Sequence, residues 1–430
     1  MIWRSFQANP ECDIRLGLRK RAHYFRSVSV SLSSHKIDGL EMAVNVGKRT
    51  NNSLPPLDLS AAPVAMFLRR CGVRKLSPAA RAQLYDLGTS MSQPEWRSLY
   101  KRAQVEGMSA LVFAHAAEVG LPPVMPAEIA ESLQTAYRNF WIWNRRLRGE
   151  LPRINDALKA HNIDVIAFKG ATLAERLYGE IALRPIGDID LLVRAEDLDA
   201  CGRILARIGY APVPGRAKQS QWHALVNRAL NFRHDAGFLL DVHWAVTSQP
   251  AYVVSFPLAE IWQSAERMQL VGRSVRRLSA ADELRYLCYH YAAQHEDKRL
   301  IWLVDIAEIV RTLPPTWDWG QFAADTIVRG LATPVSVALN TAQTVLELAV
   351  PTKLLMTLGE AAERPQERAA WRMAQASRYG LRAMYEHIKV QNGIRGRIAF
   401  AWQGFLSHGV LPTEQRLLTL RQRLPALRKG

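Results

Sequence analysis

The stretch at residues 163–193, IDVIAFKGATLAERLYGEIALRPIGDIDLLV, decides the fold that we expect for this chain. It opens with a short run of β-branched and aromatic residues that stops at Gly170, which is typical of a buried strand ended by a tight turn. A brief amphipathic helix follows, and Gly179 stands where a C-terminal cap is expected. A loop then leads to a second apolar strand at 188–193. The stretch therefore predicts a strand–turn–helix–strand unit.

The second strand carries two carboxylates on one face. Side chains two apart in a strand point the same way, so Asp188 and Asp190 are aimed together. At about 4 Å and an effective dielectric near 20, their repulsion is on the order of 4 kcal/mol. A proton, a cationic side chain or a divalent cation would offset it; alternatively, both side chains face water. If the pair repels, asparagine at either position should leave thermal stability equal or higher. Asp197 and Asp199 share this spacing but open a predicted helix, where they complement the helix dipole.

A third carboxylate lies about fifty residues further on, in the apolar run FLLDVHW at 238–244. Asp241 stands between Leu240 and Val242, and an aspartate is costly to bury there unless it is paired or binds a metal. Three inward carboxylates on two strands favour a two-metal phosphoryl-transfer site. The alternative is a structural ion pair between Asp241 and an arginine. His243 shares the strand face of Asp241, either as a structural histidine or as a participant.

These motifs resemble a known family. FKGATLAERLYGEIALRPIGDIDLLV followed by LLDVHW is similar to a bacterial family of uncharacterised nucleotidyltransferases, within the superfamily that includes DNA polymerase beta. The stretches at 94–123 and 287–310 also resemble that family, so the likeness covers about residues 65–430. It implies an α+β fold, in which a small mixed-sheet core is flanked by N- and C-terminal helical regions. It also implies transfer of a nucleoside monophosphate from an NTP to an acceptor, with Mg²⁺ or Mn²⁺ as cofactor.

The resemblance also assigns roles to residues of the motif. Gly170 matches the turn glycine against which the triphosphate lies, because the missing Cβ permits close approach. Asp188 and Asp190 match the pair that holds both metals. Asp241 matches the third carboxylate, which holds the catalytic metal and helps to deprotonate the attacking hydroxyl.

The turn departs from the pattern of the wider superfamily, which prefers Gly-Gly or Gly-Ser. Here Lys169 precedes the glycine and Ala171 follows it, so the phosphate-binding serine is missing. We expect Thr172 or backbone amides to replace it. Lys169 and Arg184 are expected either to contact the phosphates or the leaving group, or to balance the charge of the aspartates.

Composition predicts a globular chain of two or three domains, because 48% of the 430 residues are hydrophobic and twelve are tryptophan. Four widely spaced cysteines and the lack of an apolar run of about 20 residues suggest a cytoplasmic protein without a transmembrane segment. For residues 1–41 we weighed a transit-type leader against an extension upstream of a true start at Met42, and favour the latter. We expect a poorly ordered extension, a helical lead-in, the nucleotidyltransferase core, a helical bundle and a basic helical region, at residues 1–55, 56–160, 161–250, 251–350 and 351–430.

The charge of the chain suggests an anionic partner. The net charge is +17, and residues 390–430 contain seven Lys or Arg against one Glu. The partner expected on this basis is a nucleic acid, another anionic polymer or a membrane surface. Three kinds of function therefore stay open: transfer to a small molecule, carbohydrate or peptide; a toxin-like transferase acting on tRNA; or non-catalytic binding of nucleotide or polyanion. Phosphoryl transfer by the same fold is a further alternative.

Overall fold

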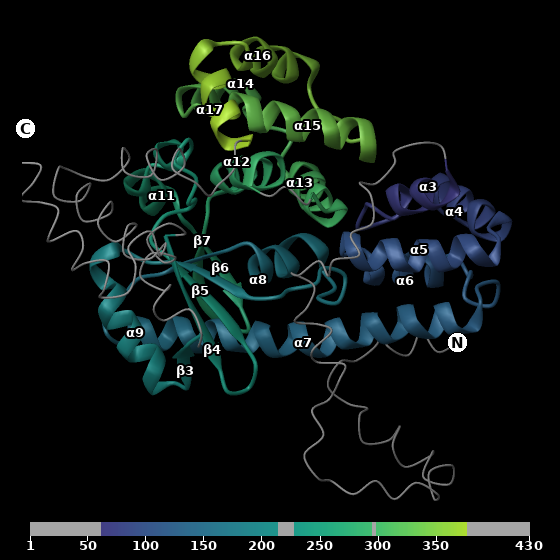
Figure 1. Cartoon of the computed structure of the whole chain (residues 1–430), viewed down its shortest axis with the longest axis horizontal. Helices are drawn as coiled ribbons and strands as arrows, with labels where there is room; N and C mark the ends of the chain where they lie inside the picture. The colour runs from purple at the N-terminus through teal and green to yellow at the C-terminus, as the bar shows by residue number, and fades with distance from the viewer. Residues whose placement is uncertain (1–61, 214–227, 295–297, 376–430) are drawn as a thin grey trace, which may run out of the picture. The chain divides into compact units, whose positions relative to one another are not determined.

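The predicted strand–turn–helix–strand unit forms the centre of a seven-stranded mixed sheet (Figure 1). The structure is a computed structural model that describes residues 62–213, 228–294 and 298–375. Strand β1 (Ile166–Phe168) pairs antiparallel with β2 (Ile189–Leu192), and β2 pairs parallel with β5 (Leu239–His243). All three are the short apolar runs that the sequence predicted as strands.

The remaining strands complete the sheet in the order β3-β4-β5-β2-β1-β7-β6. They are β3 (Tyr210–Pro212), β4 (Ala229–His234), β6 (Glu266–Leu270) and β7 (Arg273–Arg277). Strands β6 and β7 form a hairpin whose two turn residues, Val271 and Gly272, have φ values of 51° and 71°, as a type I′ turn requires. The sequence did not predict this hairpin, which lies where we expected only helices.

Within the described residues, five helices precede the sheet, in the region where we expected a helical lead-in. Serine at an N-cap with glutamate three residues later forms a capping box at the start of α5, and Gly107 ends that helix in the left-handed conformation at φ 71°. The last helix, α7, is 33 residues long and delivers the chain to β1. The helices are α3 (Pro63–Arg70), α4 (Pro78–Ser90), α5 (Gln93–Glu106), α6 (Ser109–Glu118) and α7 (Ala127–Lys159).

Short helices connect the strands. After β1 the chain forms α8 (Gly170–Leu173), which continues as a π-helical turn at Ala174–Tyr178 and ends at Gly179, a left-handed residue at φ 71°. Helix α9 (Leu198–Arg207) follows β2, and α11 (Leu258–Ser264) precedes β6.

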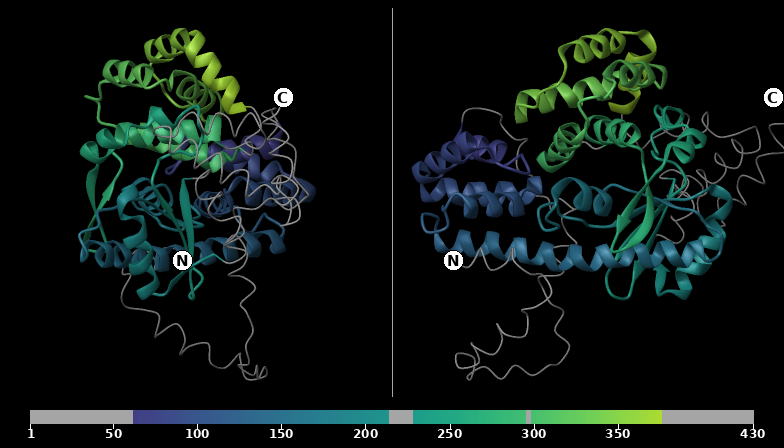
Figure 2. Two further views of the ribbon diagram at one scale, coloured as in Figure 1. Left: turned by 60° about the vertical axis from the view of Figure 1, so that its left-hand side comes forward. Right: turned by 180° about the vertical axis from the view of Figure 1, so that it is seen from behind.

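A helical bundle follows β7. Ser279 caps its first helix by accepting a hydrogen bond from the Asp282 amide. Figures 1 and 2 show α7 on one side of the sheet and these helices on the other. They are α12 (Ala280–Tyr289), α13 (Leu300–Thr312), α14 (Trp319–Val328), α15 (Ala332–Leu346), α16 (Thr352–Ala362) and α17 (Pro365–Gln375).

The mixed sheet with helices before and after it confirms the predicted α+β fold. The predicted N-terminal extension at 1–55 and the basic cluster at 390–430 lie outside the described residues. Within the described ranges, no helix combines the length and the apolar character needed to cross a membrane.

Candidate active site

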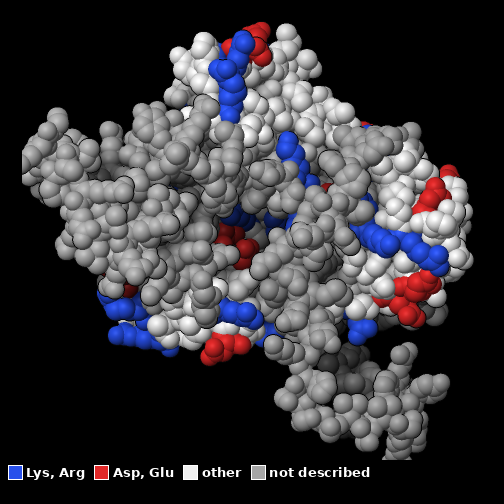
Figure 3. Space-filling view, viewed as in Figure 1, with Lys and Arg blue, Asp and Glu red and all other residues white. Residues whose placement is uncertain are grey.

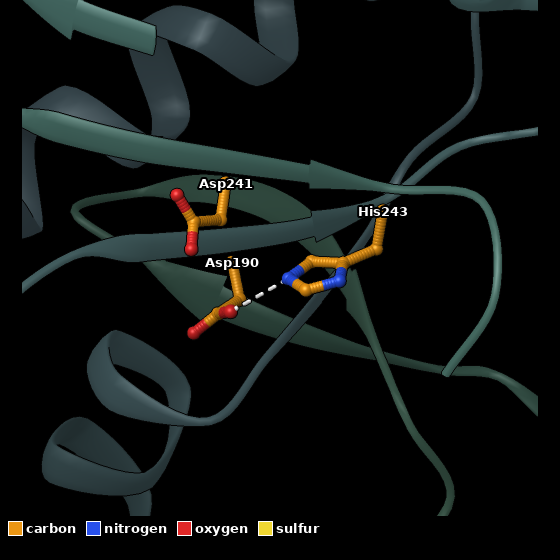
Figure 4. A group of neighbouring side chains, drawn as sticks. All are labelled: Asp190, Asp241 and His243. Carbon is orange, nitrogen blue, oxygen red and sulfur yellow. Dashed lines mark hydrogen bonds and ion pairs between the residues drawn. The ribbon is translucent and has the colours of Figure 1, made fainter. Parts of the chain in front are cut away.

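Strands β2 and β5 place two carboxylates side by side. Asp190 and Asp241 are register partners in this parallel pair, so their side chains leave the same face of the sheet. His243, two residues after Asp241, points to that face as predicted, and its Nε2 lies 2.9 Å from Oδ1 of Asp190. Figure 4 shows the three side chains converging. Asp190 is 4% exposed and the other two are half-buried, and one potential ligand atom from each lies within 4.8 Å of the others.

An asparagine, and not an arginine, holds Asp241. Asn231 on β4 is its register partner across the antiparallel pair, and the Asn231 amide donates a hydrogen bond of 2.6 Å to Oδ1 of Asp241. The structural ion pair with arginine that we weighed as an alternative is not formed among the described residues. Asn231 was not predicted as a site residue from the sequence, although a polar residue within the strand pattern ALNFRH indicated a partner for a buried polar group.

Lys169 supplies a cation inside the cluster. Its Nζ lies 2.9 Å from Oδ1 of Asp190, and 5.1 and 5.6 Å from the ring centroids of Phe168 and Tyr286. The backbone of Lys169 has φ 60° and ψ −138°, a conformation that glycine adopts freely. For a residue with a Cβ, such a conformation costs on the order of 1–3 kcal/mol. The lysine side chain must therefore make contacts that offset this strain. Tyr286, on α12, is a neighbour that the sequence did not indicate.

The three carboxyl groups have different proton affinities. Burial, together with the nearby charges of Asp190 and Asp241, raises the pKa of Asp188 to about 8. Burial also acts to raise the pKa of Asp190, but the Lys169 ammonium and the hydrogen bond from His243 outweigh it and lower that pKa to about 2. Burial and then the charge of Asp190 raise the pKa of Asp241. In the metal-free protein, a proton on Asp188 and the ammonium of Lys169 thus relieve the repulsion.

Asp188 precedes β2 by one residue and is partly buried. Its carboxylate forms no hydrogen bond or ion pair with any other part of the chain that the structure describes. The carboxylates of Asp190 and Asp241 are close enough to act on its pKa. It is thus a third carboxyl group close to Asp190 and Asp241.

Gly170 packs against the chain's own loop. A Cβ added there would lie 2.9 Å from Cγ2 of Ile186 and 3.2 Å from the carbonyl oxygen of Asp188. Thr172, which is buried, donates a hydrogen bond of 2.9 Å to the carbonyl oxygen of Lys169. The hydroxyl that we expected to replace the missing serine is thus bonded to the turn itself. The nucleotide contacts of both residues stay predictions.

Arg184 pairs away from the aspartate cluster. Its guanidinium makes a two-pronged ion pair with Asp305 on α13, with Nη2 at 2.8 Å from Oδ2 and Nε at 2.9 Å from Oδ1. Tyr178 donates a further hydrogen bond of 2.6 Å to the same carboxylate, which is 0% exposed. Asp305 is thus the buried ion-pair partner of Arg184. In this arrangement Arg184 anchors the loop that leads to Asp188, and its phosphate contact stays a prediction.

Helix α7 holds the same loop from the other side. The Trp143 indole donates to the carbonyl oxygen of Ile186 at 3.0 Å, and the Asn144 amide donates to that of Arg184 at 2.8 Å. Both side chains are buried. Sequence reasoning missed them, because nothing in the helical pattern distinguishes a tryptophan that binds a distant carbonyl from one that only packs.

The donor set fits a divalent cation. Carboxylate oxygens are the ligands that Mg²⁺ prefers, and an added imidazole nitrogen is compatible with Mn²⁺. Asp190, Asp241 and His243 together could hold a metal ion. On the face drawn in Figure 3, acidic and basic atoms lie side by side near the centre.

Comparison with known proteins defines the class. A family model described as uncharacterised nucleotidyltransferase matches residues 92–347, more than half of the chain, so the protein belongs to this family. A search of curated proteins gives no match. One similar solved structure is that of an antigenic nucleotidyltransferase-like protein from Paracoccidioides brasiliensis, 17% identical over 49% of this chain and 95% of that chain, with a TM-score of 0.33. A TM-score this low does not support an argument about the site.

Proposed function

We propose that the protein is a metal-dependent nucleotidyltransferase, which transfers a nucleoside monophosphate from an NTP to a hydroxyl or phosphate group of an acceptor. The acceptor class that we favour is a small molecule, a carbohydrate or a peptide. The observation that carries the proposal is the in-register placement of Asp190 and Asp241 on neighbouring parallel strands, with His243 and Asp188 beside them. Membership of the nucleotidyltransferase family supports it.

In this proposal Asp188, Asp190 and Asp241 hold Mg²⁺ or Mn²⁺, and His243 is a further ligand or orients Asp190. The bound cation supplies positive charge that stabilises the oxygens on which charge develops. Asn231 fixes the orientation of Asp241 through its hydrogen bond. The phosphates of the NTP lie against the turn at Gly170.

The reaction balances as an in-line displacement at the α-phosphorus. The acceptor oxygen forms a bond to this phosphorus, the bond to the bridging oxygen of the β-phosphate breaks, and pyrophosphate leaves. Asp241 takes the proton of an attacking hydroxyl. Lys169 lies at the turn and contacts the phosphates, so that its charge compensates the departing pyrophosphate.

Labelled nucleotides test this proposal. The purified protein is incubated with Mg²⁺ or Mn²⁺, a cell extract and an NTP labelled at the α- or the γ-phosphate. We expect label from the α-phosphate alone in an acceptor fraction, and its loss with a chelator or in Asp241→Asn. Label from the γ-phosphate alone would show phosphoryl transfer instead. If neither label is transferred with any of the four NTPs, the proposal is wrong.

The charge of +17 favours one second candidate, transfer to a nucleic acid such as tRNA. Treatment of the labelled fraction with ribonuclease or with protease distinguishes the two. Ribonuclease-sensitive label would establish this second candidate, and resistant label would support the first.

A further inference from the structure

We propose that Lys169 is a built-in counter-cation, which holds the Asp190 carboxylate in the metal-free protein and is exchanged for the divalent cation when that cation binds. This inference rests on the proposed function in one respect, because it takes the group of Asp190, Asp241 and His243 as the metal site. It adds a competition at that site between a side chain of the protein and the metal.

Oδ1 of Asp190 already has two close neighbours. Nζ of Lys169 and Nε2 of His243 both lie 2.9 Å from Oδ1 of Asp190. A carboxylate oxygen has two lone pairs, so both positions on this atom are occupied. A cation that binds to Oδ1 must therefore displace one of these two neighbours. The ammonium is the one that repels it.

The backbone of Lys169 is strained. A lysine there holds φ 60° and ψ −138°, where glycine would be free of strain. Its charged side chain spans the distance to Asp190 and passes the rings of Phe168 and Tyr286 at 5.1 and 5.6 Å. These contacts hold the ammonium at the cluster. The strained backbone conformation directs the lysine side chain to where it can make them.

The displaced ammonium of Lys169 has a place to go. The Lys169 side chain is 19% exposed and the Asp190 side chain 3% exposed, so the lysine lies on the open side of the pair. After displacement it stays close to the Asp188 carboxyl group and to the turn at Gly170, where we place the phosphates. One cation thus serves the metal-free cluster and then the substrate.

The exchange is tested with Mn²⁺ alone, without nucleotide, by electron paramagnetic resonance titration of free Mn²⁺. Lys169→Met removes the ammonium and keeps most of the side-chain volume. We expect this variant to bind Mn²⁺ about tenfold more tightly than the native protein, because no internal cation competes; tenfold corresponds to about 1.4 kcal/mol. Lys159→Met removes one lysine charge from the α7 surface and should leave the affinity within about twofold of native.

Thermal melting supplies the second measurement. Without metal, Lys169→Met should melt at a lower temperature than the native protein, because the carboxylates lose their counter-charge, and saturating Mn²⁺ should reduce or reverse the difference. Lys169→Gly also lacks the ammonium but relieves the backbone strain. It should match the methionine variant in Mn²⁺ affinity and melt at a higher temperature than that variant.

The outcomes separate this inference from the proposed function. Equal Mn²⁺ affinity in the native protein and in both Lys169 variants would overturn the exchange and leave the metal site intact. Weaker binding in the variants would show that Lys169 only supports the site structurally, and would also overturn it. Absence of Mn²⁺ binding in all of these proteins would remove the metal site itself, and with it both proposals.

Discussion

Three aspartates on or next to strands β2 and β5 share one region of space but differ in the partners of their carboxyl groups. Asp190 is paired with Lys169, Asp241 with Asn231, and Asp188 has neither kind of partner among the described residues. The consequences of replacing each carboxyl group therefore differ, although Asp188 and Asp190 are equivalent positions in the sequence pattern D-x-D.

Asp190→Asn should destabilise the metal-free protein. The repulsion inferred from the sequence predicted equal or higher stability, but the structure leads to the opposite expectation. The substitution leaves the partly buried ammonium of Lys169 without its ion-pair partner. Breaking a fully buried pair costs about 3–5 kcal/mol, so we expect a smaller loss here. Urea denaturation in the presence of a chelator measures the change. The double variant with Lys169→Met, which removes both charges, should recover part of the loss, and its failure to do so would contradict this account.

Asp188→Asn should stabilise the metal-free protein, and increasingly so as the pH rises. The folded-state pKa of Asp188 is raised from an ordinary 3.8 to about 8, so the folded protein retains a proton that the unfolded chain releases between these values. The contribution of Asp188 to the free energy of unfolding is therefore fully present below about pH 4, and it is lost as the pH rises to 8. Asparagine does not titrate. Its advantage should be near zero at pH 3 and exceed about 1 kcal/mol at pH 8.5.

Denaturation at a series of pH values with a chelator checks this prediction. Asp199→Asn is a matched control, because this exposed aspartate in the first turn of α9 belongs to the second D-x-D of the chain and lies outside the cluster. A constant difference between native protein and Asp188→Asn across the series would show that the carboxyl group does not hold a proton at neutral pH.

At the scale of elements, the loop between the π-helical turn and β2 determines where Asp188 stands. Helix α7 bonds its carbonyl oxygens through Trp143 and Asn144, and α13 binds Arg184 through Asp305. The loop is thus fixed by two helices that are far apart in the sequence. Its own sequence contains little regular structure that could fix it.

Asp305→Asn should destabilise the protein far more than Tyr178→Phe. Asp305 is fully buried, and it accepts from both Arg184 and Tyr178. The asparagine substitution leaves the guanidinium of Arg184 buried and unpaired, which costs about 3–5 kcal/mol. The phenylalanine substitution removes one hydrogen bond to a charged group, about 1.5–3 kcal/mol. Urea denaturation of the two variants compares them, and equal losses would contradict the view that the ion pair anchors the loop.

How far the sequence predicts these elements depends on the kind of signal that each one carries. Strands β1, β2 and β5 are apolar runs ended by glycine or charge, so their existence and the shared face of Asp241 and His243 follow from local pattern. Strands β6 and β7 carry charged, exposed residues such as Arg267 and Arg273, and have no apolar run to reveal them.

Side-chain partners were harder to predict than strands. The pairs Asn231–Asp241 and Arg184–Asp305 join residues 10 and 121 positions apart. Their formation depends on strand register and on helix packing, which no local period encodes. Arg184 shows the result, because its type and position suggested a phosphate contact while its partner came from α13.

At the scale of the whole molecule, the helical regions before and after the sheet are connected to each other as well as to the site. Glu106, at the end of α5, accepts a hydrogen bond of 2.7 Å from the amide of Leu300, at the start of α13. Since α13 also carries Asp305, the lead-in and the bundle support the same loop. The site therefore depends on packing that extends well beyond the sheet.

The net charge of the molecule leads to the last prediction, which concerns polyanions. The chain has 56 Lys and Arg against 39 Asp and Glu, and several of its described arginines, such as Arg184 and Arg277, are buried in internal ion pairs. Each such pair removes one positive and one negative charge, so these pairs do not reduce the excess of 17 positive charges. Residues 390–430 alone contribute +6, from seven basic residues and one acidic residue.

We expect the full chain to bind single-stranded RNA electrostatically, with an affinity that falls at least about tenfold between about 50 and 200 mM salt, because each neutralised phosphate releases condensed counterions. Fluorescence anisotropy of a labelled oligonucleotide measures this. Transfer of label to a small uncharged acceptor should change little over the same range, since no counterions are released there. If transfer to the natural acceptor follows the salt dependence of RNA binding, the acceptor is a polyanion. RNA binding that does not respond to salt would contradict the electrostatic account.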